Sequence, residues 1–159
     1  MQKSKLMSGV LAASLAVIAL LSAGCGIQSI PQAKNQTEAA LAEVTNQYKR
    51  RADLVPNLVA TVKGYASHEK ETLDAVTEAR AKATASNIDP SNMSAEKLAE
   101  FQRAQGQLSQ ALGRLMVITE NYPNLKADQN FRDLQAQLEG TENRITNARR
   151  LLIEDIKAF

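Results

Sequence analysis

Apolar residues recur three or four positions apart over most of the chain after residue 40, with polar residues between them. This spacing is typical of amphipathic helices that pack along a neighbour. Pro56 interrupts the first apolar stripe, because proline lacks the N–H that would bond to the carbonyl of Ala52. We therefore expect a kink at Pro56, or a new helix there with Asp53 as its N-cap. The stripe consists of Leu41, Val44, Tyr48, Val55, Leu58, Val62, Tyr65, Leu73, Val76 and Ala83.

Two more stripes follow, each after a segment rich in turn formers. Residues 86–94 should end the first arm, with Ser94 as the N-cap of the next helix, and residues 121–128 should end that helix. The second stripe is Leu98, Phe101, Gln105, Leu108, Leu112 and Leu115, and the third is Phe131, Leu134, Leu138, Thr141, Ile145, Ala148 and Leu152. The sequence therefore predicts an all-α fold. It should be an elongated antiparallel bundle of three long helices, or of four if the segment before Pro56 is separate.

The first 24 residues have the three parts of a secretory signal peptide. Lys3 and Lys5 form a basic start, residues 6–21 are almost wholly apolar, and small residues precede Cys25. Cys25 is the only cysteine, and a lone thiol in this place is the usual acceptor of a lipid. We therefore predict a lipoprotein signal peptide over residues 1–24, lipidation at Cys25, a polar tether over residues 25–37 and the bundle over residues 38–159. The alternative is an uncleaved anchor, since about 20 apolar residues can span a bilayer.

Both interpretations attach the chain to a membrane and place its C-terminal part outside the cytoplasm, because the basic residues flank the N-terminal side of the apolar segment. In Gram-negative bacteria, aspartate after the lipidated cysteine favours retention in the inner membrane, whereas this chain has Gly26. If the source has two membranes, we expect the lipidated form in the outer membrane with the bundle in the periplasm. An uncleaved N-terminal helix would instead hold it in the inner membrane.

Charge and cysteine content narrow the classes of function. Two of the 19 Lys and Arg residues precede Cys25, whereas all 17 Asp and Glu residues follow it. The chain after Cys25 therefore has 17 basic and 17 acidic residues and no net charge. A nucleic-acid binder normally has a basic excess, which is missing here. One cysteine allows neither an intrachain disulfide nor a cysteine-rich zinc site. We expect no nucleic-acid partner, no metal and no cofactor.

The sequence contains no convincing catalytic site. His68 is the only histidine, and the helical positions four places from it, Gly64 and Thr72, hold no carboxylate that could share a ligand with it. Glu71, Asp74 and Glu78 share a helix face but alternate with basic residues, as on an ordinary charged surface. No zinc-protease, phosphate-loop or nucleophile-elbow motif occurs. We therefore predict that the protein is not an enzyme.

Two basic clusters, residues 49–51 and 149–150, lie beside the apolar stripes. They could contact phospholipid headgroups, each basic residue being worth about 1 kcal/mol near an anionic surface. They could also pair with Asp53, Glu142 or Asp155, and we favour this structural role.

Gly106 and Gly113 lie one heptad apart in the second helix. Each costs about 1 kcal/mol relative to alanine in a helix interior. Close approach of another helix would explain them, and chance is the alternative.

Four blocks of the sequence resemble the LemA family of bacterial membrane-associated proteins. They are "RRADLVPNLV", "VKGYASHE", "YPNLKA" and "TENRI", in the family's usual order. The resemblance implies a long helical bundle attached to a membrane through an N-terminal hydrophobic segment, and it brings no catalytic residues. The chain departs from the family in having no tryptophan before the first block and "LLI" after "NARR". Members of the family tend to continue past the "ARR" block with a Tyr-Asn pair and a further tail. If that tail normally covers the first helix, residues 38–52 should pack less well here.

Two functions therefore remain open. The first is a non-enzymatic envelope lipoprotein whose bundle scaffolds or regulates other envelope proteins. The alternative is a carrier or sensor of a hydrophobic ligand held between the helices, where Gly106 and Gly113 would leave room for a groove.

Overall fold

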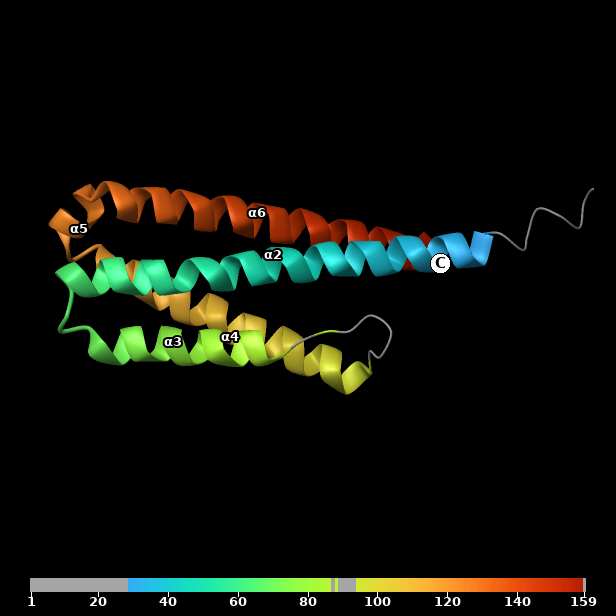
Figure 1. Ribbon diagram of the computed structural model, residues 1–159, viewed down its shortest axis with the longest axis horizontal. Helices are drawn as coiled ribbons and strands as arrows, with labels where there is room; N and C mark the ends of the chain where they lie inside the picture. The colour runs from blue at the N-terminus through green and yellow to red at the C-terminus, as the bar shows by residue number, and fades with distance from the viewer. Residues whose placement is uncertain (1–28, 87, 89–93, 159) are drawn as a thin grey trace, which may run out of the picture.

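The protein is an elongated helical bundle. The computed structural model describes residues 29–86, 88 and 94–158, and no strand occurs among them, which confirms the all-α class. Four long helices, α2 (Ser29–Tyr65), α3 (Lys70–Ala85), α4 (Ala95–Thr119) and α6 (Gln129–Ala158), lie side by side, and the short α5 (Pro123–Ala127) joins α4 to α6 at one end (Figure 1). The predicted signal peptide and Cys25 lie outside the described residues.

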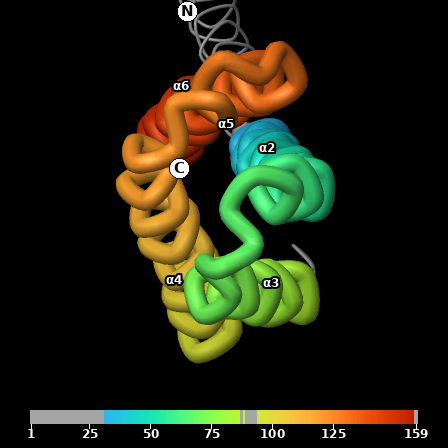
Figure 2. Tube along the Cα trace, turned by 90° about the vertical axis from the view of Figure 1, so that its left-hand side faces the viewer, coloured from blue at the N-terminus to red at the C-terminus, as the bar shows by residue number. Residues whose placement is uncertain are grey.

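The four long helices form an open strip rather than a closed ring. α2 packs along α6 and α3, and α3 packs along α4. Seen along the bundle, the order is therefore α6, α2, α3, α4 (Figure 2). Within the described ranges, α4 and α6 are not among the extensively packed pairs, and they diverge with distance from α5 (Figure 1). One side of the bundle is thus left open between α4 and α6.

The first arm breaks ten residues later than we predicted. α2 continues through Pro56, and the chain turns at residues 66–69 so that α3 folds back along α2. The expectation of a new helix at Pro56, with Asp53 as its N-cap, is therefore wrong. The carbonyl of Ala52, which Pro56 cannot bond, instead accepts a hydrogen bond from Nε of Arg80 in α3 at 2.8 Å. A buried carbonyl needs a hydrogen-bond donor. Because Pro56 leaves the carbonyl of Ala52 unbonded within α2, this carbonyl can bind α3.

The start of α2 bears on two other expectations. Residues 29–37, which we expected in the tether, are helical. Residues 38–52 are also well packed, because α2 lies along α6 in this region and Leu41, Val44 and Ala52 are buried. Within the described part of the chain, no helix is long and apolar enough to cross a membrane.

Apolar side chains form two separate clusters. The main core draws on α2 to α6 and includes Leu58, Leu108, Leu115 and Phe131. A smaller cluster of Leu41, Ile88 and Phe101 lies toward the start of α2. Most positions of the three predicted stripes are buried, whereas Tyr48, Leu98 and Leu152 are partly buried and Tyr65 is 44% exposed.

Ser94 is the N-cap that we predicted, and Asp128 caps α6 in the same way, which we did not predict. Ser94 Oγ accepts from the backbone N–H of Lys97 at the start of α4. Asp128 Oδ1 accepts from the N–H of Phe131 at the start of α6, at 2.9 Å. That bond, together with a second from the Tyr65 hydroxyl, holds the pKa of the Asp128 carboxyl below its usual value. Both caps satisfy backbone donors that the first helical turn leaves free.

Candidate functional site

A buried arginine joins three helices between the two apolar clusters. Arg51 of α2 is 1% exposed. Its Nη1 donates to Ser109 Oγ of α4 at 2.6 Å and to Glu142 Oε1 of α6 at 2.9 Å. Its Nη2 donates to the backbone carbonyl of Gln105 at 3.0 Å and to Gln105 Oε1 at 2.7 Å. Arg51 thus bridges α4 and α6, which are not among the extensively packed helix pairs of the described chain.

The surroundings of Arg51 explain how its charge is tolerated. Glu142 supplies the counter-charge and is 49% exposed, so its carboxylate keeps contact with water. The guanidinium carbon also lies 5.1 Å from the centroid of the Tyr48 ring, which is within the range of a cation–π interaction. The Nε–H of Arg51 is buried and has no acceptor among the described residues. The network is therefore strong at both Nη atoms and incomplete at Nε.

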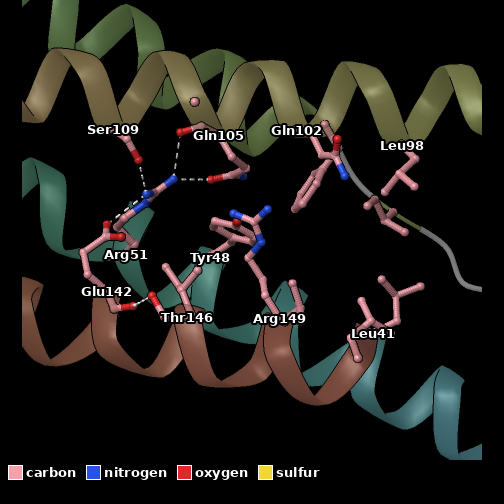
Figure 3. A pocket seen from close by; sticks show the side chains of 16 residues that line it. Leu41, Tyr48, Arg51, Leu98, Gln102, Gln105, Ser109, Glu142, Thr146 and Arg149 are labelled. Carbon is pink, nitrogen blue, oxygen red and sulfur yellow. Dashed lines mark hydrogen bonds and ion pairs between the residues drawn. The ribbon is translucent and has the colours of Figure 1, made fainter. Parts of the chain in front are cut away.

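Beside this arginine lies a cavity of about 250 Å³, which we call the Arg51 cavity (Figure 3). Most of its walls come from α2, α4 and α6, and apolar side chains line the part away from Arg51. Tyr48 and Phe101 meet there edge to face, with ring centroids 5.3 Å apart. The lining residues are Leu41, Val44, Tyr48, Arg51, Ile88, Leu98, Phe101, Gln102, Gln105, Gly106, Ser109, Glu142, Ile145, Thr146, Arg149 and Leu152.

A second, more open depression of about 540 Å³ continues between α4 and α6 toward α5, and we call it the Gly113 groove. It shares Ser109 and Glu142 with the Arg51 cavity. Apolar and polar side chains both line it: Leu112, Gly113, Met116 and Leu138 together with Gln135, Glu139 and Asn143. The two depressions follow the open side of the bundle.

Both glycines of α4 face these spaces. Gly106 lines the Arg51 cavity and Gly113 lines the groove that bears its name. A Cβ atom added at either position would meet no atom within 4 Å, backbone atoms of its own helix aside. Close approach of a neighbouring helix is therefore not the reason for these glycines. Their positions instead widen the space between α4 and α6.

The residues of the two basic clusters differ in whether they form ion pairs. Arg51 pairs with Glu142, which confirms the structural role that we favoured for it. Arg150 pairs with Glu154 at 2.7 Å, a partner that the sequence did not suggest. Arg149 points from α6 into the Arg51 cavity (Figure 3). It forms no ion pair or hydrogen bond with any residue that the structure describes.

The other candidate residues lie in a turn or on the outer face of α3, and they line neither the Arg51 cavity nor the Gly113 groove. His68 is exposed in the turn between α2 and α3 rather than within a helix. Glu78 pairs with Lys82 at 2.7 Å, and this bond holds the pKa of Glu78 below its usual value. Among residues 29–86, 88 and 94–158, no group of three His, Cys, Asp or Glu side chains is placed to hold a metal.

The comparison with known families agrees with the sequence blocks described above. The sequence model of the LemA family matches residues 40–159, which include every described helix except the first turns of α2. No curated protein was found to match the chain. The match covers the Arg51 network, both depressions and the two glycines that open them. The chain therefore belongs to the LemA family.

Proposed function

We propose that this LemA family protein is a non-enzymatic scaffold or regulator of other proteins of the bacterial envelope. It would be held at a membrane by a lipid on Cys25, with the bundle outside the cytoplasm. The observation that carries the proposal is the Gly113 groove, an open depression between α4 and α6, which are not among the extensively packed helix pairs of the described chain. Such a groove suits an amphipathic helix of a partner, which would complete the bundle on its open side.

The lining of the Gly113 groove defines the partner helix. Leu112, Met116 and Leu138 would contact its apolar face. Glu139 and Glu142 lie on the α6 side, so a basic residue on the partner would meet them there. Gly113 would let the partner backbone approach α4 closely, as small residues do at helix interfaces.

Site-specific photo-crosslinking in intact cells tests this proposal. A photoreactive residue in place of Gln135, which lines the groove, should give a discrete adduct with another envelope protein. The same residue in place of Ala136, an exposed position one step round the helix, should not.

Filling the groove supplies the decisive control. Gly113→Leu should abolish the adduct formed from position 135, because the new side chain occupies the partner's place. Gly140→Leu should leave it, since Gly140 also has open space around its Cα but does not line the groove. An adduct that survives Gly113→Leu, or that forms equally from position 136, would overturn the proposal.

The membrane anchor has its own test. Cys25→Ser should block lipid transfer, so that a palmitate analogue labels only the wild type and the variant keeps the mass of the precursor. Equal labelling of the two forms would exclude lipidation at Cys25. Full precursor mass in the wild type, found wholly with inner-membrane markers, would favour the uncleaved N-terminal helix and exclude outer-membrane residence.

A second candidate function, carriage or sensing of a hydrophobic ligand, is favoured by a different observation. The Arg51 cavity is lined by apolar side chains from three helices and is only slightly smaller than typical ligand sites, which begin at about 300 Å³. Binding of a small aliphatic molecule to this cavity would be the defining property of such a protein.

A further inference from the structure

The Arg51 cavity has an apolar part and a polar part, and the two are separated. The apolar part lies toward the start of α2, where Leu41, Phe101 and Leu152 come together. The polar part is formed by Arg51 and the side chains that bond it (Figure 3). A ligand that fills this space must therefore combine an aliphatic chain with a polar head.

The charge of the cavity wall determines the kind of head. Two guanidinium groups line the cavity, Arg51 and Arg149, and only one carboxylate, Glu142. Glu142 already pairs with Arg51. Arg149 points into the cavity, and its charge forms no ion pair with any described residue (Figure 3). An anion would balance it, and the planar guanidinium matches a carboxylate or phosphate with two parallel hydrogen bonds.

The buried side chain of Arg51 contributes charge rather than a free donor to the cavity. Both Nη atoms already have acceptors, and the Nε–H, which has no acceptor in the part of the chain that the structure describes, is buried out of reach of the cavity. The group in the cavity wall that is left to bind a ligand head is therefore Arg149.

We propose that the Arg51 cavity binds an acidic amphiphile, a short aliphatic chain ending in a carboxylate or phosphate, with the head at Arg149 and the chain against Leu41, Phe101 and Leu152. This inference rests on the second candidate function and names its ligand class. Gly106 keeps the α4 wall open, because a side chain there would enter the cavity. The head can belong to a free acid or to a membrane lipid.

Calorimetric titration of the full chain in lipid nanodiscs tests the proposal, with empty nanodiscs as the blank. Octanoate and octyl phosphate should both bind. Each should bind at least about tenfold more tightly than octanol, since hydrogen bonds to a charged group are worth about 1.5–3 kcal/mol. Nanodiscs containing phosphatidic acid should weaken octanoate binding if a membrane lipid is the natural source, and should leave it unchanged if a free acid is.

Four variants connect binding to the cavity. Arg149→Gln should remove the preference for octanoate over octanol, whereas Arg150→Gln, whose side chain pairs with Glu154, should keep it. Gly106→Leu should abolish binding of both compounds, whereas Gly140→Leu should not. Gly106→Leu should also unfold at a temperature no lower than the wild type, because it replaces a glycine in open space.

The possible failures are distinguishable. If octanol binds as tightly as octanoate and octyl phosphate, the acidic head is wrong and the carrier function stands. If octylammonium binds best, Glu142 rather than Arg149 selects the head and the proposal is overturned. If none of these compounds binds, both the proposal and the carrier function fail.

Discussion

At the scale of single residues, Arg51 is the most informative position in the molecule. It is a buried cation with four hydrogen bonds to α4 and α6, so it links two helices that are not extensively packed on each other in the described chain. It also divides the main core from the small cluster at Phe101. A side chain in this position fixes how the helices are arranged as well as how stable they are.

Arg51→Met should lower the free energy of unfolding by about 2–4 kcal/mol, because it removes a buried charged network and leaves Gln105 without its donor. Arg50→Met should change it by less than about 0.5 kcal/mol, since the adjacent side chain is exposed. Urea unfolding followed by circular dichroism measures both. Equal losses for the two variants would contradict the buried network.

The sequence allowed part of this site to be predicted. Arg51 and Glu142 could be matched because both lie near the apolar stripes of antiparallel neighbours. Sequence position did not distinguish Arg149 from Arg150, since both are basic and exposed and only the helix rotation turns Arg149 into the cavity. The two glycines were noticed, but whether they lie against a helix or an open space depends on how α4 and α6 diverge.

At the scale of helices, α2 shows how a proline inside a helix can be used in packing. Pro56 leaves the carbonyl of Ala52 without its helical donor, and Arg80 of α3 supplies one. From the sequence we expected Pro56 to interrupt the helix, because proline always removes one helical hydrogen bond. The hydrogen bond from Arg80 could not be predicted, because it depends on the turn at residues 66–69 that brings α3 alongside α2. That turn contains no glycine or proline, so nothing in its composition separated α2 from α3.

The link between Pro56 and Arg80 predicts coupling between the two positions. Arg80→Met should destabilise the wild type by about 1 kcal/mol, because the carbonyl of Ala52 then loses its donor. In the Pro56→Ala background it should cost less, since the substituted alanine would supply a helical N–H to the same carbonyl. A double-mutant cycle of urea unfolding measures the coupling. Additive effects of the two substitutions would contradict this account.

At the scale of the whole molecule, two tyrosines join the turns at the α5 end. The hydroxyl of Tyr65, at the end of α2, donates to Asp128 Oδ2 at 2.9 Å. The hydroxyl of Tyr122, before α5, donates to Glu69 Oε1 at 2.8 Å. These bonds raise the pKa of both tyrosines above their usual value of 10.0, since ionisation would lose the bond and place two negative charges together. These two hydrogen bonds therefore help to hold the turns at the α5 end of the bundle together.

The raised pKa values give a pH dependence with a definite sign. A group whose pKa is raised on folding stabilises the fold below its unfolded pKa and loses that contribution as the pH rises through the folded value. The double variant Tyr65→Phe/Tyr122→Phe should thus be less stable than the wild type at neutral pH, with the difference shrinking by about pH 11. Urea unfolding at the two pH values checks this. A difference independent of pH would mean that the hydroxyl bonds do not contribute.

The central claim is that the bundle is open between α4 and α6, since both proposed binding sites depend on it. The most direct test is the stability of Gly106→Ala and Gly113→Ala, measured by urea unfolding. If both glycines face open space, each substitution should raise the free energy of unfolding, by up to about 1 kcal/mol, because alanine is the better helix former. A loss of stability in either variant would mean that a helix packs against that glycine, and would contradict the open bundle.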